Sequence, residues 1–162
     1  MFREMRRKNQ MLTTQDSIAI LNKNTSGVLA ILGDEGYPYS VPLSHAYQDG
    51  KLYFHCAKKG HKIDAIVNSN KASFCVIDAD DVIPAEYTTY FRSVIAFGKI
   101  RIAKNDAEKR EALLRLVDKY SPAHREAGKY EIEKLLAGVQ VLVFEIEHMT
   151  GKESIELVRA KK

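Results

Sequence analysis

The sequence predicts a mainly antiparallel β-sheet that closes into a small barrel, with helices packed outside it. Three observations predict this fold class. Short apolar or alternating segments recur along the chain, turn residues separate most of them, and only a few segments repeat with helical periodicity. Closure is favoured because it removes the exposed edges of an antiparallel sheet.

The N-terminal part of the chain predicts a helix and then a strand. Thr13 or Thr14 can cap a short helix, because a threonine oxygen accepts a hydrogen bond from a free N–H group of the first turn. The apolar residues 27–32 predict a buried strand, and residues 33–36 predict a turn.

Two more strands are predicted on either side of a hairpin turn. Residues 37–47 alternate well enough to form a strand. Pro38 and Pro42 interrupt it and lack the donor for strand pairing, so they belong at an edge, a bulge or a ligand contact. Asp49–Gly50 is a hairpin signal that leads into the next strand, over residues 52–56.

The middle of the chain predicts a helix, a strand, a loop and a long strand. Helical periodicity begins at Ile63, and a fourth strand is predicted over residues 72–77. The acidic residues 78–86 predict a loop. A long strand follows over residues 88–103, with a bulge or bend at Gly98.

The C-terminal part predicts two helices and a last strand. Asn105 or Asp106 begins an amphipathic helix that ends at Ser121–Pro122. A second short helix is predicted over residues 132–136, and the last strand over residues 139–146. The apolar face of the first of these helices consists of Leu113, Leu116, Val117 and Tyr120.

Length and composition predict one soluble domain over residues 1–162. Hydrophobic residues make up 45% of the chain and charged residues 28%, which is ordinary for a globular protein. The basic N-terminus is followed by a polar segment rather than by an apolar signal-peptide core, and no stretch is apolar enough to cross a bilayer. We therefore expect a cytoplasmic protein without membrane contact.

Charge and cysteine usage exclude several function classes. The net charge of +4 forms no basic stripe, so nucleic-acid binding is not expected, whereas an anionic small ligand suits it. Cys56 and Cys75 are the only cysteines and have no further cysteines at metal-ligand spacing. A reducing compartment, buried inert thiols and the absence of a metal site are the simplest interpretation.

The most informative segment is the basic turn, residues 57–62, which joins a strand to a helix. The start of a helix presents free N–H groups and the positive end of the helix dipole, and both favour an anion. Lys58, Lys59 and Lys62 add formal positive charge at the same place. A phosphate-bearing ligand is one interpretation, and a set of solvated lysines is the other.

With these elements in order, the chain resembles the split-barrel flavin-binding family related to pyridoxamine 5'-phosphate oxidase. Within that family it is most similar to the branch associated with 5-nitroimidazole resistance. The resemblance covers most of the chain and implies an antiparallel split β-barrel with peripheral helices, of the α+β class. The segments that carry it are residues 36–43, 53–57 with 60–62, 90–98 and 146–152.

The resemblance implies FMN bound at the interface of a homodimer. It places the flavin phosphate at the basic turn, where Lys62 pairs with it, and the flavin ring beside residues 40–43. His61 is then either a further phosphate contact or a solvated side chain. The residues implied in cofactor binding are Ser40, Val41, Pro42, Leu43, His55, Cys56, Ala57, Lys59, Gly60, His61, Lys62, Arg92 and Ser93.

The chain departs from the family pattern in two places. Pyridoxamine phosphate oxidases carry an Arg/Lys pair in the turn and an arginine-rich C-terminal signature, but here the turn ends in Gly60-His61-Lys62 and residues 156–162 lack that signature. Oxidation of vitamin B6 is therefore not expected.

His55 is the candidate catalytic residue, as a proton donor to the flavin or the substrate, and a structural histidine with one hydrogen bond is the alternative. His45, His124 and His148 lack metal-type partners, so no metal ligand is assigned. Ser44 and Cys56 have histidines nearby in sequence, which does not make a catalytic triad.

The sequence thus predicts an FMN-dependent oxidoreductase. Electrons from NAD(P)H would pass through FMN to a small planar acceptor such as a nitroimidazole or another nitroaromatic. The main alternative is a non-catalytic flavin or haem binding or storage protein on the same barrel, with His55 or His61 as the haem ligand. A deazaflavin cofactor and an interaction domain with an empty barrel also remain open.

Overall fold

One antiparallel sheet of 7 strands, in the order β2-β1-β5-β6-β7-β4-β3, organises the fold. The structure is a computed structural model that describes residues 1–161. The strands are β1 (Ser26–Leu32), β2 (Pro38–Ser44), β3 (Ala46–Gln48), β4 (Lys51–Ala57), β5 (Lys71–Ile83), β6 (Thr88–Ile102) and β7 (Val139–Glu153). The helices are α1 (Thr14–Lys23), α2 (His61–Asn68), α3 (Asp106–Tyr120), α4 (Arg125–Leu135) and α5 (Ile155–Arg159).

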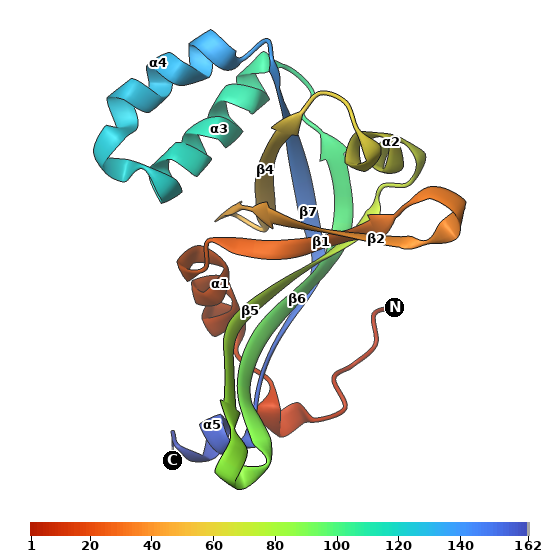
Figure 1. The fold of residues 1–162 in the computed structure, drawn as a ribbon, viewed down its shortest axis with the longest axis vertical. Helices are drawn as coiled ribbons and strands as arrows, with labels where there is room; N and C mark the ends of the chain where they lie inside the picture. The colour runs from red at the N-terminus through yellow and green to blue at the C-terminus, as the bar shows by residue number, and fades with distance from the viewer. Residues whose placement is uncertain (162) are drawn as a thin grey trace.

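The sheet curls into a barrel that stays split, as the resemblance predicts. Every strand pair is antiparallel, and β2 at one edge pairs only with β1 among the described residues. Val41 and Leu43 of β2 nevertheless pack on the same core as Phe54 of β4. Apolar packing therefore brings the two sides of the split together without hydrogen bonds between them (Figure 1).

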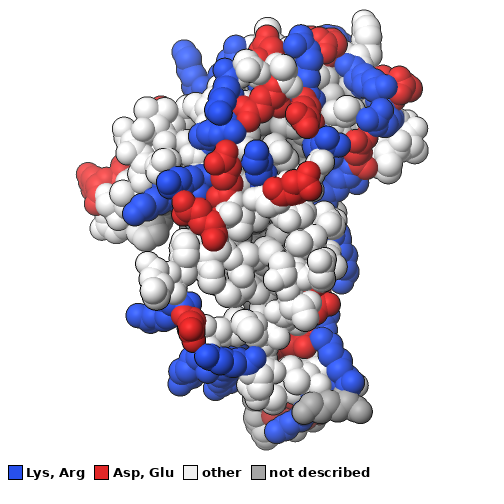
Figure 2. All heavy atoms as spheres, turned by 180° about the vertical axis from the view of Figure 1, so that it is seen from behind, with Lys and Arg blue, Asp and Glu red and all other residues white. Residues whose placement is uncertain are grey.

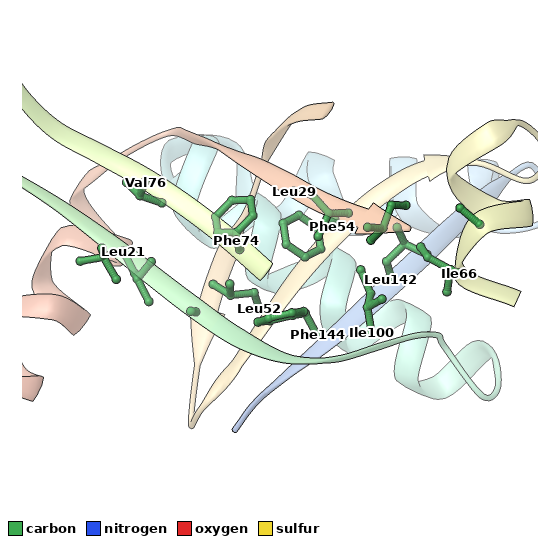
Figure 3. Close-up of a cluster of buried hydrophobic side chains, with 14 of the residues drawn as sticks. Leu21, Leu29, Leu52, Phe54, Ile66, Phe74, Val76, Ile100, Leu142 and Phe144 are labelled. Atoms are coloured by element: carbon green, nitrogen blue, oxygen red, sulfur yellow. The ribbon is translucent and has the colours of Figure 1, made fainter. Parts of the chain in front are cut away.

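The core lies inside the curled sheet and is aromatic at its centre. Phe54 and Phe74 are fully buried, with their ring centroids 5.1 Å apart at an interplanar angle of 61°. Figure 3 shows these rings among aliphatic side chains from several strands and from α2. The core forms because alternate residues of each strand point to the same face. Edge-to-face geometry of this kind adds to the burial of the rings.

Two helices, α1 and α2, contribute side chains to the core of the barrel. Ile20 and Leu21 of α1 and Ile63 and Ile66 of α2 belong to the central core. The start of α1 is fixed by Thr13, whose side chain accepts from the Asp16 N–H at 3.0 Å. The cap predicted at Thr13 or Thr14 is confirmed at Thr13.

The remaining long helices, α3 and α4, form a hairpin on the outside of the barrel (Figure 1). Ala112 and Leu113 of α3 pack on Val141 and Val143 of β7 and on Tyr53 of β4. The helix predicted from Asn105 or Asp106 is confirmed, with Asn105 as its cap. The second helix begins at Arg125, well before the predicted start.

The predicted strand over residues 37–47 is wrong in one respect, because it is two strands that meet at His45. Up to Ser44 the chain pairs with β1, and from Ala46 it pairs with β4. At His45 the Tyr120 hydroxyl accepts from the backbone N–H at 2.9 Å and donates to the carbonyl at 2.8 Å. A side chain 75 residues away thus satisfies the backbone where the strand changes partner.

The acidic loop predicted over residues 78–86 is also wrong. β5 continues to Ile83 and forms a long hairpin with β6 that projects from the barrel (Figure 1). The strand continues because the Asp78 carboxylate is buried and paired, accepting from Lys23 at 2.9 Å and from Arg92 at 3.2 Å. A bulge at this point re-aligns the strand, and only Pro84–Glu86 form a turn. β7 likewise continues past its predicted end to Glu153.

Candidate functional site

The basic turn and the start of α2 form a surface open to an anion. Gly60 is the N-cap of α2, has φ 128 and makes no side-chain capping bond. Its carbonyl accepts from Ile63 and Asp64, which leaves the N–H groups of His61 and Lys62 without helical partners. Nothing lies within 4 Å of the place where a Cβ of Gly60 would stand. The turn therefore combines a positive φ, free donors and open space.

His61 is held by the β1–β2 hairpin. Its ring stacks on Tyr39 with centroids 4.1 Å apart, and its Nε2 lies 3.6 Å from an Asp34 carboxylate oxygen. The structure thus gives His61 contacts that the sequence did not predict. They fix the first residue of α2 relative to β2, on which further predicted site residues lie.

The four predicted residues of β2 divide into two pairs. Val41 and Leu43 point into the barrel and pack on the core. Ser40 and Pro42 point outward and are exposed. Because β2 is an edge strand, the outer edge of its backbone is free for a ligand. Pro42 at such an edge agrees with the sequence interpretation.

The predicted residues of β4 alternate in the same way. His55 and Ala57 are exposed on the outside of the barrel. Cys56 is partly buried against the core, and burial raises the pKa of its thiol. Its thiol is therefore disfavoured as a nucleophile, as expected. We use the name site strip for the outward residues of β2 and β4 together with the basic turn.

Arg92 and Ser93 do not lie at the site strip of the same chain. Arg92 pairs with Asp78 at 3.2 Å and with Glu153 at 3.1 Å, and both carboxylates are nearly buried. The end of β6 near α2 is marked by Ile100, whose N–H donates to Asn70. From Ser93 to Ile100 an extended strand covers roughly 23 Å at ~3.3 Å per residue. One chain therefore brings the β2, β4 and turn residues together and leaves this pair apart.

Sequence reasoning missed a pocket beside His55. A cavity of about 280 Å³ lies beside the contact between β4 and the α3–α4 hairpin and is bordered by Ser44, His55, Val117, Tyr120 and other residues. The signal was present, because the apolar face of α3 was predicted from its periodicity. Of that face, Leu113 packs on the sheet cluster, and Leu116, Val117 and Tyr120 line the pocket.

A buried polar cluster around His45 and Lys119 lies where β2 meets β3. His45 is fully buried, and its Nε2 donates to the Leu21 carbonyl at 2.8 Å. Burial and the nearby Lys119 lower the pKa of His45 to about 4, and burial lowers the pKa of Lys119 to about 8. The neutral imidazole fixes the position at which β2 becomes β3.

Residues 1–161 contain neither a cluster of metal ligands nor a membrane-spanning helix. No group of three or more His, Cys, Asp or Glu side chains is arranged to hold a metal ion there. No helix among these residues has the length and apolar character to span a membrane.

Comparison with known proteins places this geometry in a family. The family model described as pyridoxamine 5'-phosphate oxidase matches residues 13–153. No curated protein matches the sequence. A similar solved structure is a candidate 5-nitroimidazole antibiotic resistance protein of Bacteroides thetaiotaomicron, with 23% identity, a TM-score of 0.73, and coverage of 88% of this chain and 86% of that chain.

Two further solved structures have a similar fold. The flavocytochrome of Azotobacter vinelandii has 19% identity and a TM-score of 0.76 over 93% of this chain and 72% of that chain. The FAD and haem binding protein of Mycobacterium smegmatis has 20% identity and a TM-score of 0.76 over 95% and 80%. At these identities the likeness concerns the fold. The match of the family model over residues 13–153 shows that the chain belongs to the pyridoxamine 5'-phosphate oxidase family.

Proposed function

We propose that the protein binds FMN along the site strip and uses it to reduce small planar acceptors, such as nitroimidazoles or other nitroaromatics, with electrons from NAD(P)H. The observation that carries this proposal is the basic turn. Its uncapped helix start, its positive-φ Gly60 and its lysines fit a phosphate ester. The bound flavin would supply hydride and electron transfer, and the chain would supply binding, orientation and charge.

The residues of the strip suit the parts of FMN in order. Lys62 and the free N–H groups of the turn would hold the phosphate. The outward Ser40 and Pro42 would lie beside the ring system, with main-chain groups of His55 to Ala57 on the other side. The exposed imidazole of His55 would serve as the proton donor to the flavin or the substrate.

A homodimer is part of the proposal, because Arg92 and Ser93 would reach the flavin only from a second copy. The outer face of β1, β5 and β6 offers an uncharged surface for that copy. Val28, Cys75 and Ile95 stand side by side in the strand register, and Ile95 and Phe97 are exposed at 39% and 40%. Seen from behind, the molecule has a broad uncharged band across its middle (Figure 2). Such a surface is typical of an interface between copies.

Haem binding without catalysis is the second candidate, and the exposed imidazole of His55 favours it, since an axial ligand must be accessible. Absorbance of the purified protein, before and after addition of FMN, separates the candidates. Flavin bands support the proposal, and a Soret band with no flavin uptake supports the haem alternative.

Lys62→Ala tests the phosphate assignment. Loss of a charge-assisted hydrogen bond is worth ~1.5–3 kcal/mol, so we expect FMN to bind roughly 10- to 100-fold more weakly. The measurement is the FMN dissociation constant by flavin fluorescence titration. Lys51→Ala, at the opposite end of β4 and partly buried like Lys62, should retain wild-type affinity. Equal FMN affinity in Lys62→Ala and wild type would refute the assignment.

A further inference from the structure

The cavity between β4 and the α3–α4 hairpin has an apolar wall and a polar border. Leu113, Leu116 and Val117 of α3 and Ile132 of α4 form the wall. Ser44 and His55, from the ends of β2 and β4, form the border on the barrel side. Aliphatic side chains with a few polar groups at one side are typical of small-molecule pockets.

The cavity exists because the helix hairpin is held at both sides of it. On one side Leu113 and Ala112 pack on Tyr53, so α3 is in contact with the sheet. On the other side Tyr120 is hydrogen-bonded to the His45 backbone. Between these contacts the strand presents His55, which is exposed and does not fill the space.

The spacing of the two helices is fixed as well. A Cβ at Gly128 of α4 would stand 2.6 Å from the Val117 side chain, so the helices approach closely only because this residue is glycine. Ile132 lies one turn further along α4 and reaches the cavity instead. Three contacts therefore hold the cavity open: α3 on Tyr53, Tyr120 on the His45 backbone, and Gly128 on Val117.

The lining contains no side chain with a permanent charge. None of the lining residues is Lys, Arg, Asp or Glu. A carboxylate or phosphate entering this cavity would lose its hydration without a cation to replace it, which is costly. A neutral ring would gain from the aliphatic wall. The volume of about 280 Å³ is enough for one small ring system.

We propose that this cavity binds the electron acceptor as a small, neutral aromatic molecule, with its ring against α3 and α4 and its polar substituent toward Ser44 and His55. The inference rests on the proposed function, because His55 borders both the cavity and the site strip. His55 lies two residues before Ala57 in β4, roughly 7 Å at ~3.4 Å per residue, so an acceptor here would lie next to a flavin on the strip.

Ile132→Trp tests the cavity by filling it from α4. Calorimetric titration of the FMN-loaded protein with nitrobenzene, in the absence of NAD(P)H, measures binding without turnover. We expect the nitrobenzene dissociation constant to rise at least ~10-fold, because extra side-chain volume in a packed space is strongly unfavourable. FMN affinity should not change. Ile132→Phe is the milder second variant if the melting temperature of the tryptophan variant falls.

Leu135→Trp is the matched control. Leu135 lies on the same helix, is 56% exposed and does not line the cavity. It should bind nitrobenzene and FMN like the wild type. If Ile132→Trp and Ile132→Phe also bind nitrobenzene like the wild type, the cavity is not the acceptor site. If they lose FMN instead, the cavity holds part of the cofactor and the inference is overturned.

A charged analogue tests the neutrality of the ligand. At pH 8, 4-nitrobenzoate should bind at least ~10-fold more weakly than nitrobenzene, because its carboxylate finds no cation in the cavity. Equal affinity would overturn the inference.

The two proposals fail separately in these experiments. A wild-type chain that binds FMN but no nitrobenzene overturns the cavity alone, whereas one that binds nitrobenzene at the cavity but no FMN contradicts the proposed function alone.

Discussion

His45 shows how a single buried side chain determines a local feature of the fold. The ring is fully buried against Phe74, with ring centroids 5.0 Å apart, and only its Nε2 has a hydrogen-bond partner. A proton on this ring would be unfavourable, because burial and the Lys119 ammonium, whose Nζ is 3.4 Å from Nε2, both oppose it.

His45 therefore makes the fold sensitive to mild acid. The pKa of His45 is about 4 in the folded protein, against an ordinary value of 6.5. At a pH between these two values, the unfolded chain binds a proton at this residue and the folded chain does not. Stability falls as pH decreases through this window, by about 3 kcal/mol in all. Urea unfolding of wild type and His45→Gln between pH 6.5 and about 5, above the range in which carboxylates become protonated, should show this slope in the wild type only.

The exposed His124 supplies the control for this experiment, since His124→Gln should retain the wild-type slope. Carboxylates do not obscure the result. Arg101 lowers the pKa of Glu108 to about 2, and hydrogen bonds lower the pKa of Asp78, so both contribute at more acidic pH. A slope that persists in His45→Gln would show that another group is responsible.

At the residue scale, sequence reasoning succeeded where the cause was local. The cap at Thr13 depends on a residue three positions away, and the positive φ at Gly50 depends on its neighbours in the turn. The partners of Arg92 lie 14 and 61 positions away, so nothing near Arg92 in sequence indicates them. Its predicted place near the flavin came from resemblance and stays a prediction.

Between elements, the C-terminal end of α1 depends on α3. The Lys119 ammonium donates to the Leu21 carbonyl at 3.0 Å and to the Asn24 carbonyl at 2.7 Å. Helix ends leave such carbonyls without partners, and a cation there also suits the helix dipole. Lys119 therefore connects two helices that are far apart in sequence.

Lys119→Met removes this connection while keeping most of the side-chain volume. We expect a loss of ~1–3 kcal/mol in the free energy of unfolding, because partly buried carbonyls lose their donor. Urea denaturation measures it. Lys129→Met on α4 is the control, because Lys129 makes only an exposed pair with Glu126, at 2.8 Å, and should cost little. A variant as stable as the wild type would show that water replaces the ammonium at no cost.

The presence and type of most helices and strands could be predicted from the sequence, but several of their boundaries could not. Alternation and turn residues identified β1, β4 and β6 within a residue or two. The extension of β5 beyond Ile77 was missed, because acidic side chains resemble a loop until buried partners such as Arg92 are known. The division of residues 37–47 depends on Tyr120, which no local pattern connects to His45.

For the whole molecule, the exposed outer face of β5 and β6 predicts self-association. Ile95→Lys places a charge among the uncharged neighbours Cys75 and Thr150. We expect a wild-type dimer, and a variant that is monomeric at micromolar concentration with weakened FMN retention, since burying an unpaired charge is costly. Sedimentation velocity measures the assembly. Tyr130→Lys, at a 71% exposed position on α4, should leave the dimer intact. A monomeric wild type would contradict this prediction.

The fold class could be predicted from hairpin spacing, and the place of the basic turn from charge and helix polarity. The candidate site could not be completed in this way. Its pieces lie on elements that meet only in three dimensions, and the proposed contribution of Arg92 and Ser93 needs a second chain, which no pattern in one sequence encodes.

The position of β7 has a consequence for how the protein is made. β7 is the last strand in the chain, yet it lies between β6 and β4 in the sheet. Until residues 139–153 leave the ribosome, β4 has only the short β3 as a partner, and the inner surface of the barrel stays open to water. Pairing over such long sequence separations is slow. The barrel therefore forms only after residues 139–153 have been synthesised, and until then its apolar inner surface stays exposed.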